Sequence, residues 1–339
     1  MTEFLTDYGL FLAKAATIVV AFLVVVGVSI ALSRKVKSHD KLEVVSLNDK
    51  YDAMAAALRS QVLPRKEQKR LTREKKAAIK ARKKHPGAAG EKRMFVVNFH
   101  GDIRATNVAS LREEITTILT LANEKDEVLI KLENTGGIVH EHGLGASQLQ
   151  RLKDAGIPTT VAVDKVAASG GYMMACVAQK IIAAPFAVIG SIGVLAQLPN
   201  FHGLLDRQGI KFEQETAGEY KRNVTMFGEN TEKDRERLRE QIEETHALFK
   251  DYVALHRPEL DMAEIATGEH WYGTRALELG LIDKISTSDD YLLEAGKQMR
   301  LYEVTYTAKK SVTARLLSSM QLATSRAPGD KLGPQYIEF

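Results

Sequence analysis

The chain is poor in cysteine and carries no uniform charge. Its single cysteine, Cys176, excludes an intrachain disulfide framework. The net charge is only +4, and residues 65–93 alone hold 13 Lys and Arg against 3 Glu, a local net of +10, so the remainder is about −6. A near-neutral to acidic protein with one basic arm does not have the charge pattern of a nucleic-acid binder. We therefore predict no nucleic-acid partner.

Charge is also absent from a stretch near the N-terminus. Residues 15–32 contain no charged side chain and are rich in Val, Ile, Leu and Ala. With residues 9–14 the run reaches membrane-spanning length, and Lys14 can extend toward the interface. The acidic residues before the run and the basic residues after it differ from a cleavable signal peptide. We predict an uncleaved single-pass anchor over residues 1–38.

A basic stalk is expected over residues 39–93. Residues 42–60 have apolar side chains spaced by four, three and four, which predicts a short amphipathic helix with one face formed by Leu47, Tyr51, Met54 and Leu58. Residues 66–84 have few large apolar side chains, which predicts an exposed helix or a flexible arm. This arm has two open interpretations: binding to anionic lipid headgroups, or a solvated spacer. Residues 86–90, Pro-Gly-Ala-Ala-Gly, mark the boundary to the next domain.

Short apolar strands alternate with amphipathic helices from residue 94 onward. We predict strands at 94–99, 127–132, 159–163 and 180–184, and helices at 108–121, 144–155 and 231–256. The alternation predicts an α/β domain with largely parallel strands over residues 94–306, followed by a tail over 307–339. The last helix is expected to bury one stripe formed by Leu238, Ile242, Leu248 and Val253.

Glycine-rich loops follow several of these strands, where ligand sites of α/β domains gather. Ser169 lies between an Ala pair and a Gly pair at the expected start of a helix. Small neighbours allow a substrate backbone to approach the hydroxyl, and the exposed N–H groups of a helix start can hold an oxyanion. Ser169 is therefore a candidate acyl-transfer nucleophile. The alternative is a serine that only caps a buried turn.

The histidines offer two further possibilities. The segment His140-Glu141-His142 lacks the His-Glu-x-x-His spacing of a zinc site, so we expect it at a groove rim or in solvent, and we predict no metal and no cofactor. A Ser-His-Asp triad is the second possibility, because such triads recur on unrelated folds. Its base would be one of His202, His246, His256 and His270. For Asp164, which lies near Ser169 in the sequence, two roles remain open: orienting a catalytic partner, or stabilising a turn.

Five segments together resemble the signal-peptide-peptidase A family of membrane-anchored Ser-Lys peptidases, and specifically its SohB-like members. The first is Leu132-Glu133-Asn134-Thr135-Gly136-Gly137, where the family more often has Ser-Pro before the glycines. The others are residues 167–172 around Ser169, residues 189–194, residues 218–222 around Lys221, and residues 271–283. The resemblance covers residues 94–300 and extends to the anchor and stalk. It implies a ClpP/crotonase-like spiral of ββα units.

The resemblance implies amide hydrolysis through an acyl-enzyme. Ser169 would be the nucleophile and Lys221, 52 residues later, the general base. A neutral lysine requires burial that depresses its pKa. The backbone N–H groups of Gly170 and of Gly136 or Gly137 would bind the oxyanion, and Ser191 would hydrogen-bond the lysine. Peptides such as signal-peptide remnants or misfolded segments would be the substrates.

Other consequences of the resemblance concern partners and location. Relatives form ring-like homo-oligomers, in some of which the serine and lysine come from neighbouring subunits. They lie in the bacterial inner membrane and largely face the periplasm, whereas the basic residues at 34, 35 and 37 favour a cytoplasmic domain by the positive-inside rule. Two alternative functions remain open: a non-catalytic membrane-anchored scaffold, and a crotonase-like acyl-CoA enzyme, which would not need Ser169 together with Lys221.

Overall fold

The protein is described here from a computed structural model, which covers residues 2–34, 41–84, 92–218, 221 and 224–308. It consists of two compact units, Met1–Lys41 with Thr307–Phe339, and Leu42–Tyr306. The smaller unit contains α1 (Thr2–Arg34), and the side chains of residues 25–34 lie outside the described part. Among the described residues, no helix has an apolar stretch long enough to cross a membrane. The predicted basic flank at 35 and 37, the boundary at 86–90 and the tail from 309 also lie outside the described residues.

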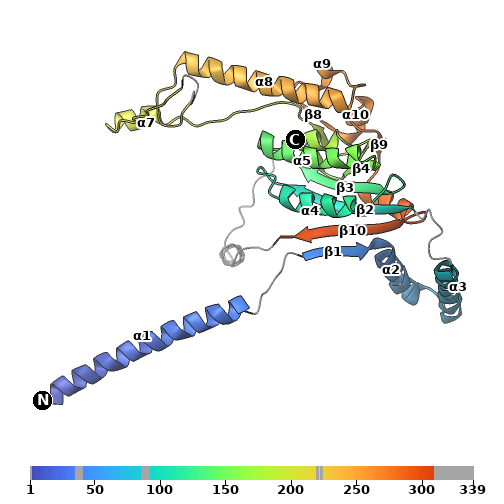
Figure 1. Cartoon of the computed structure of the whole chain (residues 1–339), viewed down its shortest axis with the longest axis horizontal. Coiled ribbons are helices and arrows are strands. Elements are labelled where there is room, and N and C mark those ends of the chain that lie inside the picture. Colours follow the sequence, from blue (N-terminus) through green and yellow to red (C-terminus); the bar gives the residue numbers. More distant parts are fainter. Residues whose placement is uncertain (1, 35–40, 85–91, 219–220, 222–223, 309–339) are drawn as a thin grey trace. The chain divides into compact units, whose positions relative to one another are not determined.

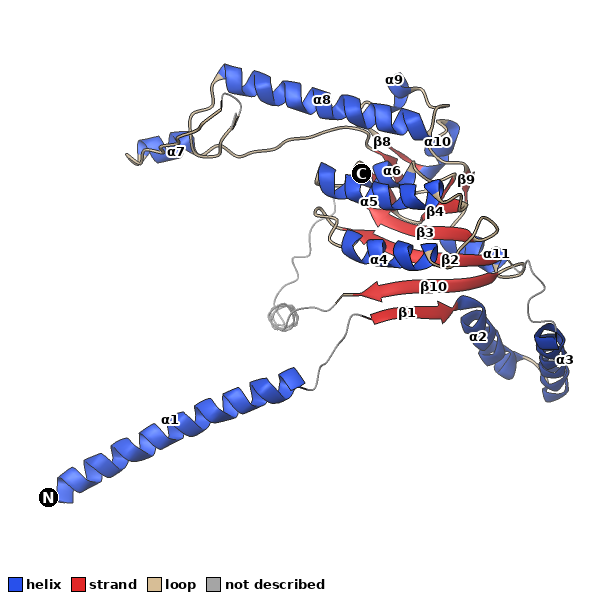
Figure 2. Cartoon of the chain, viewed as in Figure 1, coloured by secondary structure: helices blue, strands red, loops and turns tan. Residues whose placement is uncertain are grey.

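The larger unit is built on one mixed sheet (Figures 1 and 2). Its main path runs β1-β10-β2-β3-β4-β6-β9, and β5 branches from β3 to pair with β7, which pairs with β8. The β7–β8 pair is antiparallel, and the pairs from β10 to β9 and from β3 through β5 to β7 are parallel. The strands are β1 Lys41–Ser46, β2 Arg93–Gly101, β3 Glu127–Asn134, β4 Thr159–Val163, β5 Val166–Ala168, β6 Lys180–Ala183, β7 Val188–Gly190, β8 His270–Tyr272, β9 Lys284–Ile285 and β10 Arg300–Thr307.

Helices cover both faces of this sheet. Side chains of β2 alternate, so that Phe95 and Val97 join one buried cluster and Met94 and Val96 join another. The first cluster includes α4, α5 and α6, and the second includes Leu47 of α2 and residues of α11. The helices are α2 Leu47–Val62, α3 Arg65–Lys84, α4 Val108–Leu119, α5 Val139–Asp154, α6 Gly170–Ala175, α7 His202–Arg207, α8 Glu232–His256, α9 Met262–Ile265, α10 Gly273–Glu278 and α11 Ser288–Ala295.

The predicted α/β alternation is confirmed, since each predicted strand and helix from residue 94 onward corresponds to an observed one. The predicted helix over 42–60 is wrong at its start. Residues 41–46 form β1 beside β10, and Ser46 then caps α2 by accepting the Asp49 N–H at 3.3 Å. Leu47 is buried at 4% exposure against the sheet. The compact unit therefore begins at Leu42, earlier than the boundary predicted at residue 94.

The stripe predicted along α8 is confirmed only in part, since Val253 is buried, Leu238 and Ile242 are half-buried, and Leu248 is exposed. Only the C-terminal part of α8 contributes to the core, through Phe249 and Val253. Leu248 is 65% exposed. The start of the helix is specified by a capping box, in which Thr231 and Asp234 exchange hydrogen bonds.

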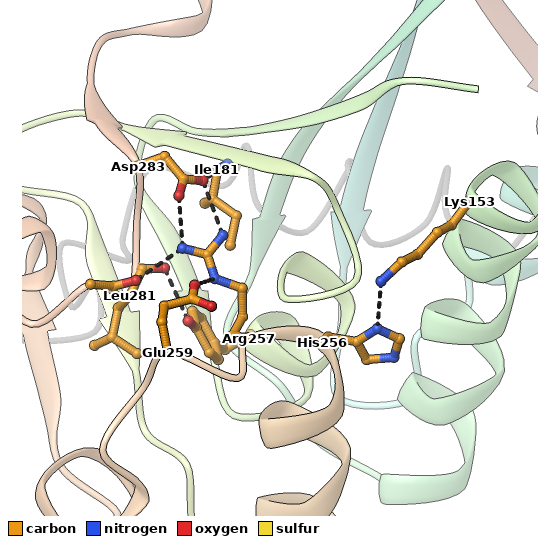
Figure 3. A network of polar contacts seen from close by, with 9 residues as sticks. Lys153, Ile181, His256, Arg257, Glu259, Leu281 and Asp283 are labelled. Atoms are coloured by element: carbon orange, nitrogen blue, oxygen red, sulfur yellow. Dashed lines mark hydrogen bonds and ion pairs between the residues drawn. The ribbon is translucent and has the colours of Figure 1, made fainter. Parts of the chain in front are cut away.

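An ion-pair network around the buried Arg257 connects the end of α8 to the sheet (Figure 3). The Arg257 side chain, 6% exposed, donates from both Nη atoms to Asp283 at 2.8 and 3.0 Å. Its Nη2 also donates to the Gly280 carbonyl, and its Nε pairs with Glu259 at 2.9 Å. Asp283 in turn accepts the Ile181 N–H of β6 at 2.6 Å. The Tyr172 hydroxyl of α6 donates to Leu281 O in the same loop, which links this network to the helix that begins after Ser169.

Replacing Arg257 with alanine is expected to lower the free energy of unfolding by about 2–3 kcal/mol, because the charge-assisted hydrogen bonds to Asp283 and Gly280 are lost. Urea unfolding of the full chain measures the change. Arg275→Ala is the matched control, since that arginine is 54% exposed and pairs only with exposed glutamates; its effect should stay below about 1 kcal/mol. Equal effects of the two substitutions would contradict this role of Arg257.

Candidate active site

Ser169 occupies a strained turn between β5 and α6. Its φ is +53°, a region that non-glycine residues rarely adopt. The strain is held by backbone hydrogen bonds, since the Ser169 N–H donates to Gly190 O at 2.8 Å and its carbonyl accepts from Met173 N–H at 3.0 Å. The side chain makes no capping hydrogen bond with α6. The interpretation of Ser169 as a mere helix cap is therefore wrong, and its hydroxyl is available for chemistry.

The Gly136-Gly137 loop lies directly against this serine. Gly136 has φ +87°, and a Cβ placed on it would lie 2.7 Å from the Ser169 Cβ, so no side chain fits there. The Gly136 N–H donates to Asn134 Oδ1 at 2.9 Å and is therefore engaged within its own loop. This disfavours the prediction for Gly136 as an oxyanion donor. Gly137, which is exposed and follows in the same loop, is the better candidate.

A cavity of about 1320 Å³ opens in front of Ser169. Its wall includes Gly136, Gly137, Ser169, Ser191 and Lys221, so the structure brings together all the predicted site residues except Gly170, which lines a smaller adjoining pocket. Lys221 is exposed, which differs from the burial expected for a neutral lysine; the flanking positions 219, 220, 222 and 223 lie outside the described residues.

Ser191 also has an unusual backbone, with φ +52°. Its N–H donates to Glu269 O at 2.6 Å, and its carbonyl accepts from Gly193 N–H at 3.0 Å. These bonds fix the loop after β7, in which Ser191 is half-buried on the wall of the cavity. The loop lies beside Ser169, because the Ser169 N–H donates to the carbonyl oxygen of the preceding Gly190.

Of the four histidines considered for the alternative triad, His246 alone is among the residues that line the cavity. His246 lines the cavity, but its Nε2 lies 3.2 Å from the Ile192 carbonyl oxygen. His256 contacts Lys153 instead, with 3.1 Å between Nδ1 and Nζ (Figure 3), and burial lowers the pKa of His256. His202 and His270 are not among the residues that line the cavity. Within the described part of the chain, no cluster of three His, Cys, Asp or Glu side chains has the arrangement of a metal site.

The expectation for His142 is wrong. His142 is fully buried rather than at a groove rim, because α5 begins at Val139 and turns this side chain inward, whereas the His140 side chain is 83% exposed. Its Nε2 lies 3.2 Å from Asn134 Oδ1. Sequence reasoning missed both residues; the only available signal was an Asn two residues before a glycine, which favours an Asx turn.

Of the two roles predicted for Asp164, the structure supports the structural role. Its carboxylate accepts the Ser288 N–H at 2.7 Å and the Ser288 hydroxyl at 2.5 Å. It therefore fixes the start of α11 on the other face of the sheet and does not orient a catalytic partner.

Comparison with known proteins identifies the family. Residues 3–149 match the profile "Peptidase family S49 N-terminal" and residues 151–302 match "Peptidase family S49". The probable protease SohB of Haemophilus influenzae is 49% identical over 323 residues, 92% of each chain. The putative signal peptide peptidase SppA of Enterococcus faecium is 28% identical over 244 residues, which cover 68% of this chain and 71% of SppA.

A solved structure with a lower similarity is a mutant of the 1510-N membrane-bound stomatin-specific protease in complex with a substrate peptide. It has a TM-score of 0.41 and 15% identity, over 68% of this chain and 98% of the other. The sequence matches confirm the family resemblance that the glycine-rich loops predicted. The chain therefore belongs to peptidase family S49 and is a serine-type endopeptidase.

Proposed function

We propose that Ser169 and Lys221 form the catalytic dyad of this endopeptidase. Ser169 Oγ attacks the scissile carbonyl carbon while the neutral Lys221 Nζ accepts the hydroxyl proton. The C–N bond then breaks, Lys221 returns the proton to the leaving amine, and water attacks the acyl-enzyme by the same route. The observation that carries this proposal concerns Ser169, whose backbone is strained and whose side chain makes no capping hydrogen bond with α6. Ser169 lines a cavity that Lys221 also lines.

The oxyanion of the tetrahedral intermediate would be bound by the N–H groups of Gly137 and Gly170. Gly170 is the first residue of α6, so its N–H has no carbonyl acceptor within the helix. The positive end of the helix dipole adds to this site, although α6 is short. Gly137 lies in the loop after β3, whereas Gly170 follows β5, and both line the same small pocket. The ends of two strands would therefore supply one N–H donor each.

Ser191 would support the dyad by hydrogen-bonding the neutral Lys221. Both side chains lie on the wall of the same cavity, and a neutral lysine amine needs an acceptor and a donor in fixed positions. Lys221 is exposed in the single chain. A homo-oligomer in which a second copy covers this wall would bury the lysine and lower its pKa.

Exposed apolar residues on the wall of the cavity support such an assembly. Leu195 is 77% exposed and Leu198 is 46% exposed, and both line the same cavity as Lys221. Burial of such side chains against a second copy would be favourable by about 25 cal/mol per Å² of apolar surface. The peptide substrate would enter the same cavity from the remaining open side.

A membrane anchor is supported by the uncharged run over residues 15–32 of α1. The basic α3 would lie on anionic headgroups. We propose an inner-membrane location, with the side of the catalytic domain decided by labelling of an introduced exposed cysteine in intact cells, since the native Cys176 is buried.

The sheet also supports a spiral of ββα units of the ClpP/crotonase kind. β4 and β6 lie in the main sheet, and the strands that follow them, β5 and β7, pair with each other in the branch. The strand β3 is long enough to pair with both β4 and β5. The repeat that the spiral would require is one strand in the main sheet, one strand in the branch, and then a helix. The strands β4 and β5 followed by α6 fit this repeat.

The full chain in detergent is expected to cleave casein, and dialysis against a chelator should leave the rate unchanged, because neither the nucleophile nor the base of the proposed dyad depends on a metal. Product peptides are identified by mass spectrometry. Hydrolysis of an acyl-CoA thioester without cleavage of casein would favour the crotonase-like alternative. Absence of any hydrolysis by the reconstituted chain, with cellular function retained in Ser169→Ala, would favour the scaffold.

A further inference from the structure

His142 is a buried histidine that the proposed dyad does not use. Its side chain is fully buried, and its ring lies against the first residue of α6: a Cβ placed on Gly170 would lie 2.5 Å from the His142 Cγ. The ring therefore fills the space that the missing side chain of Gly170 leaves. One of the two proposed oxyanion donors is packed directly on this imidazole.

The same ring is hydrogen-bonded toward the loop of the other donor. His142 Nε2 lies 3.2 Å from Asn134 Oδ1, and the same oxygen accepts the Gly136 N–H at 2.9 Å. A backbone N–H can only donate, so the oxygen rather than the nitrogen of the Asn134 carboxamide must face Gly136. It follows that His142 Nε2 acts as a donor to Asn134.

The second ring nitrogen, Nδ1, contacts the backbone at the start of α5. His142 Nδ1 lies 2.9 Å from the carbonyl oxygen of Ile138, the residue before α5. A neutral imidazole carries one N–H, so only one of these two contacts is a hydrogen bond in the neutral ring, and the other is a close packing contact. The ring is thus fixed between the start of its own helix and the end of β3, and it cannot rotate without giving up a buried contact.

Asn134 has equally little freedom. A Cβ on Gly101 would overlap its carboxamide, and its Nδ2 lies 3.5 Å from the sulfur of Met174 on α6. The Asn134 side chain is 1% exposed. The contacts therefore run without interruption from His142 through Asn134 to Gly136, whose backbone touches the nucleophile turn.

We propose that His142 and Asn134 are positioning residues of the oxyanion site, which hold the N–H groups of Gly137 and Gly170 at the separation that the tetrahedral intermediate requires. The inference rests on the proposed function, in which Ser169 is the nucleophile. Neither residue touches the substrate. They act by fixing two loops that approach Ser169 from opposite sides, where a displacement of about 1 Å can lower the rate about 100-fold.

Two substitutions of His142 separate its two polar contacts. Glutamine places an amide donor near the position of Nε2 and keeps the contact with Asn134, whereas asparagine reaches only the position of Nδ1 and keeps the contact with Ile138. With the full chain in detergent and a fluorogenic peptide, His142→Asn should lower kcat by about 10–100-fold with KM within about twofold. His142→Gln should keep kcat within about fivefold of wild type. His140→Asn, on the exposed side of the same helix, is the matched control and should have no effect.

An oxyanion-specific readout distinguishes positioning from a merely structural role. A peptide aldehyde forms an adduct with the serine whose oxygen lies in the oxyanion site, so its affinity should fall in His142→Asn by the same factor as kcat. Binding of an uncleaved peptide in the Ser169→Ala background should not change. Asn134→Ala should cause a similar loss of kcat, and the double variant with His142→Asn should be no worse than either single variant, because the two residues act as one unit.

The inference is overturned if His142→Asn keeps the wild-type kcat, if Gln and Asn are equally impaired, or if kcat, aldehyde affinity and uncleaved-peptide affinity fall together. Where His142→Asn does not fold, as judged by its thermal unfolding, Asn134→Ala with the same aldehyde measurement decides the question. A wild-type activity that is absent, or that survives Ser169→Ala, would instead contradict the proposed function, so the two failures are distinguishable.

Discussion

Ser169→Ala is expected to lower kcat for peptide hydrolysis by about 10⁴-fold or more, because the acyl-enzyme can no longer form. The removed atom is small, and the hydroxyl makes no capping hydrogen bond, so the stability of the chain should not change measurably. Initial rates on a fluorogenic peptide, with the full chain in detergent, measure the effect alongside the urea midpoint.

Ser191→Ala is the matched control for this substitution. Ser191 is also a serine with positive φ on the wall of the same cavity, so it shares the backbone strain and the surroundings of Ser169. Loss of one supporting hydrogen bond should lower kcat by only about tenfold. If Ser169→Ala were no worse than Ser191→Ala, Ser169 would not be the nucleophile.

Lys221→Ala is expected to have the second-largest effect, a loss of about 10³–10⁴-fold in kcat, since no other described lysine lines the cavity. Lys221→Arg separates the two roles that a lysine can have. Arginine keeps the positive charge but cannot lose its proton at neutral pH, so it should be as inactive as alanine if Lys221 is a base. The rates are measured with the same peptide assay.

Lys211→Ala is the control, because Lys211 is an exposed lysine on the same stretch of chain that does not line the cavity. It should keep the wild-type rate. Full activity of Lys221→Arg would mean that only charge is needed at this position, and activity of Lys221→Ala would point to a histidine base such as His246.

Local patterns in the sequence predicted the strands and helices that pack on one another directly. The apolar residues of β4 are buried throughout, and the run that they form ends where the strand ends. The first residues of the stalk were misjudged because β1 is specified by its neighbour β10, some 250 residues later, and no local period reveals such a partner. The stripe on α8 is fully buried only toward its C-terminal end, where Phe249 and Val253 join the core.

The candidate site was predictable only where one residue carries a recognisable motif. Ser169 and Lys221 stand in such motifs, and both line the cavity. The engagement of the Gly136 N–H by Asn134 and the burial of His142 depend on how three loops meet, which the spacing of residues along the chain does not encode. The start of α5 at Val139 turned a residue expected in solvent into a buried one.

The central claim is that Ser169 carries the acyl group during hydrolysis. The most direct measurement mixes the full chain with an activated ester of an acyl amino acid, quenches in acid within the first turnover, and locates the added mass after trypsin digestion. The peptide over residues 166–180 contains Ser169 as its only serine. We predict one acyl group on Ser169 and none in Ser169→Ala; an acyl group on another residue, or turnover of the ester with no adduct on this peptide, would contradict the account.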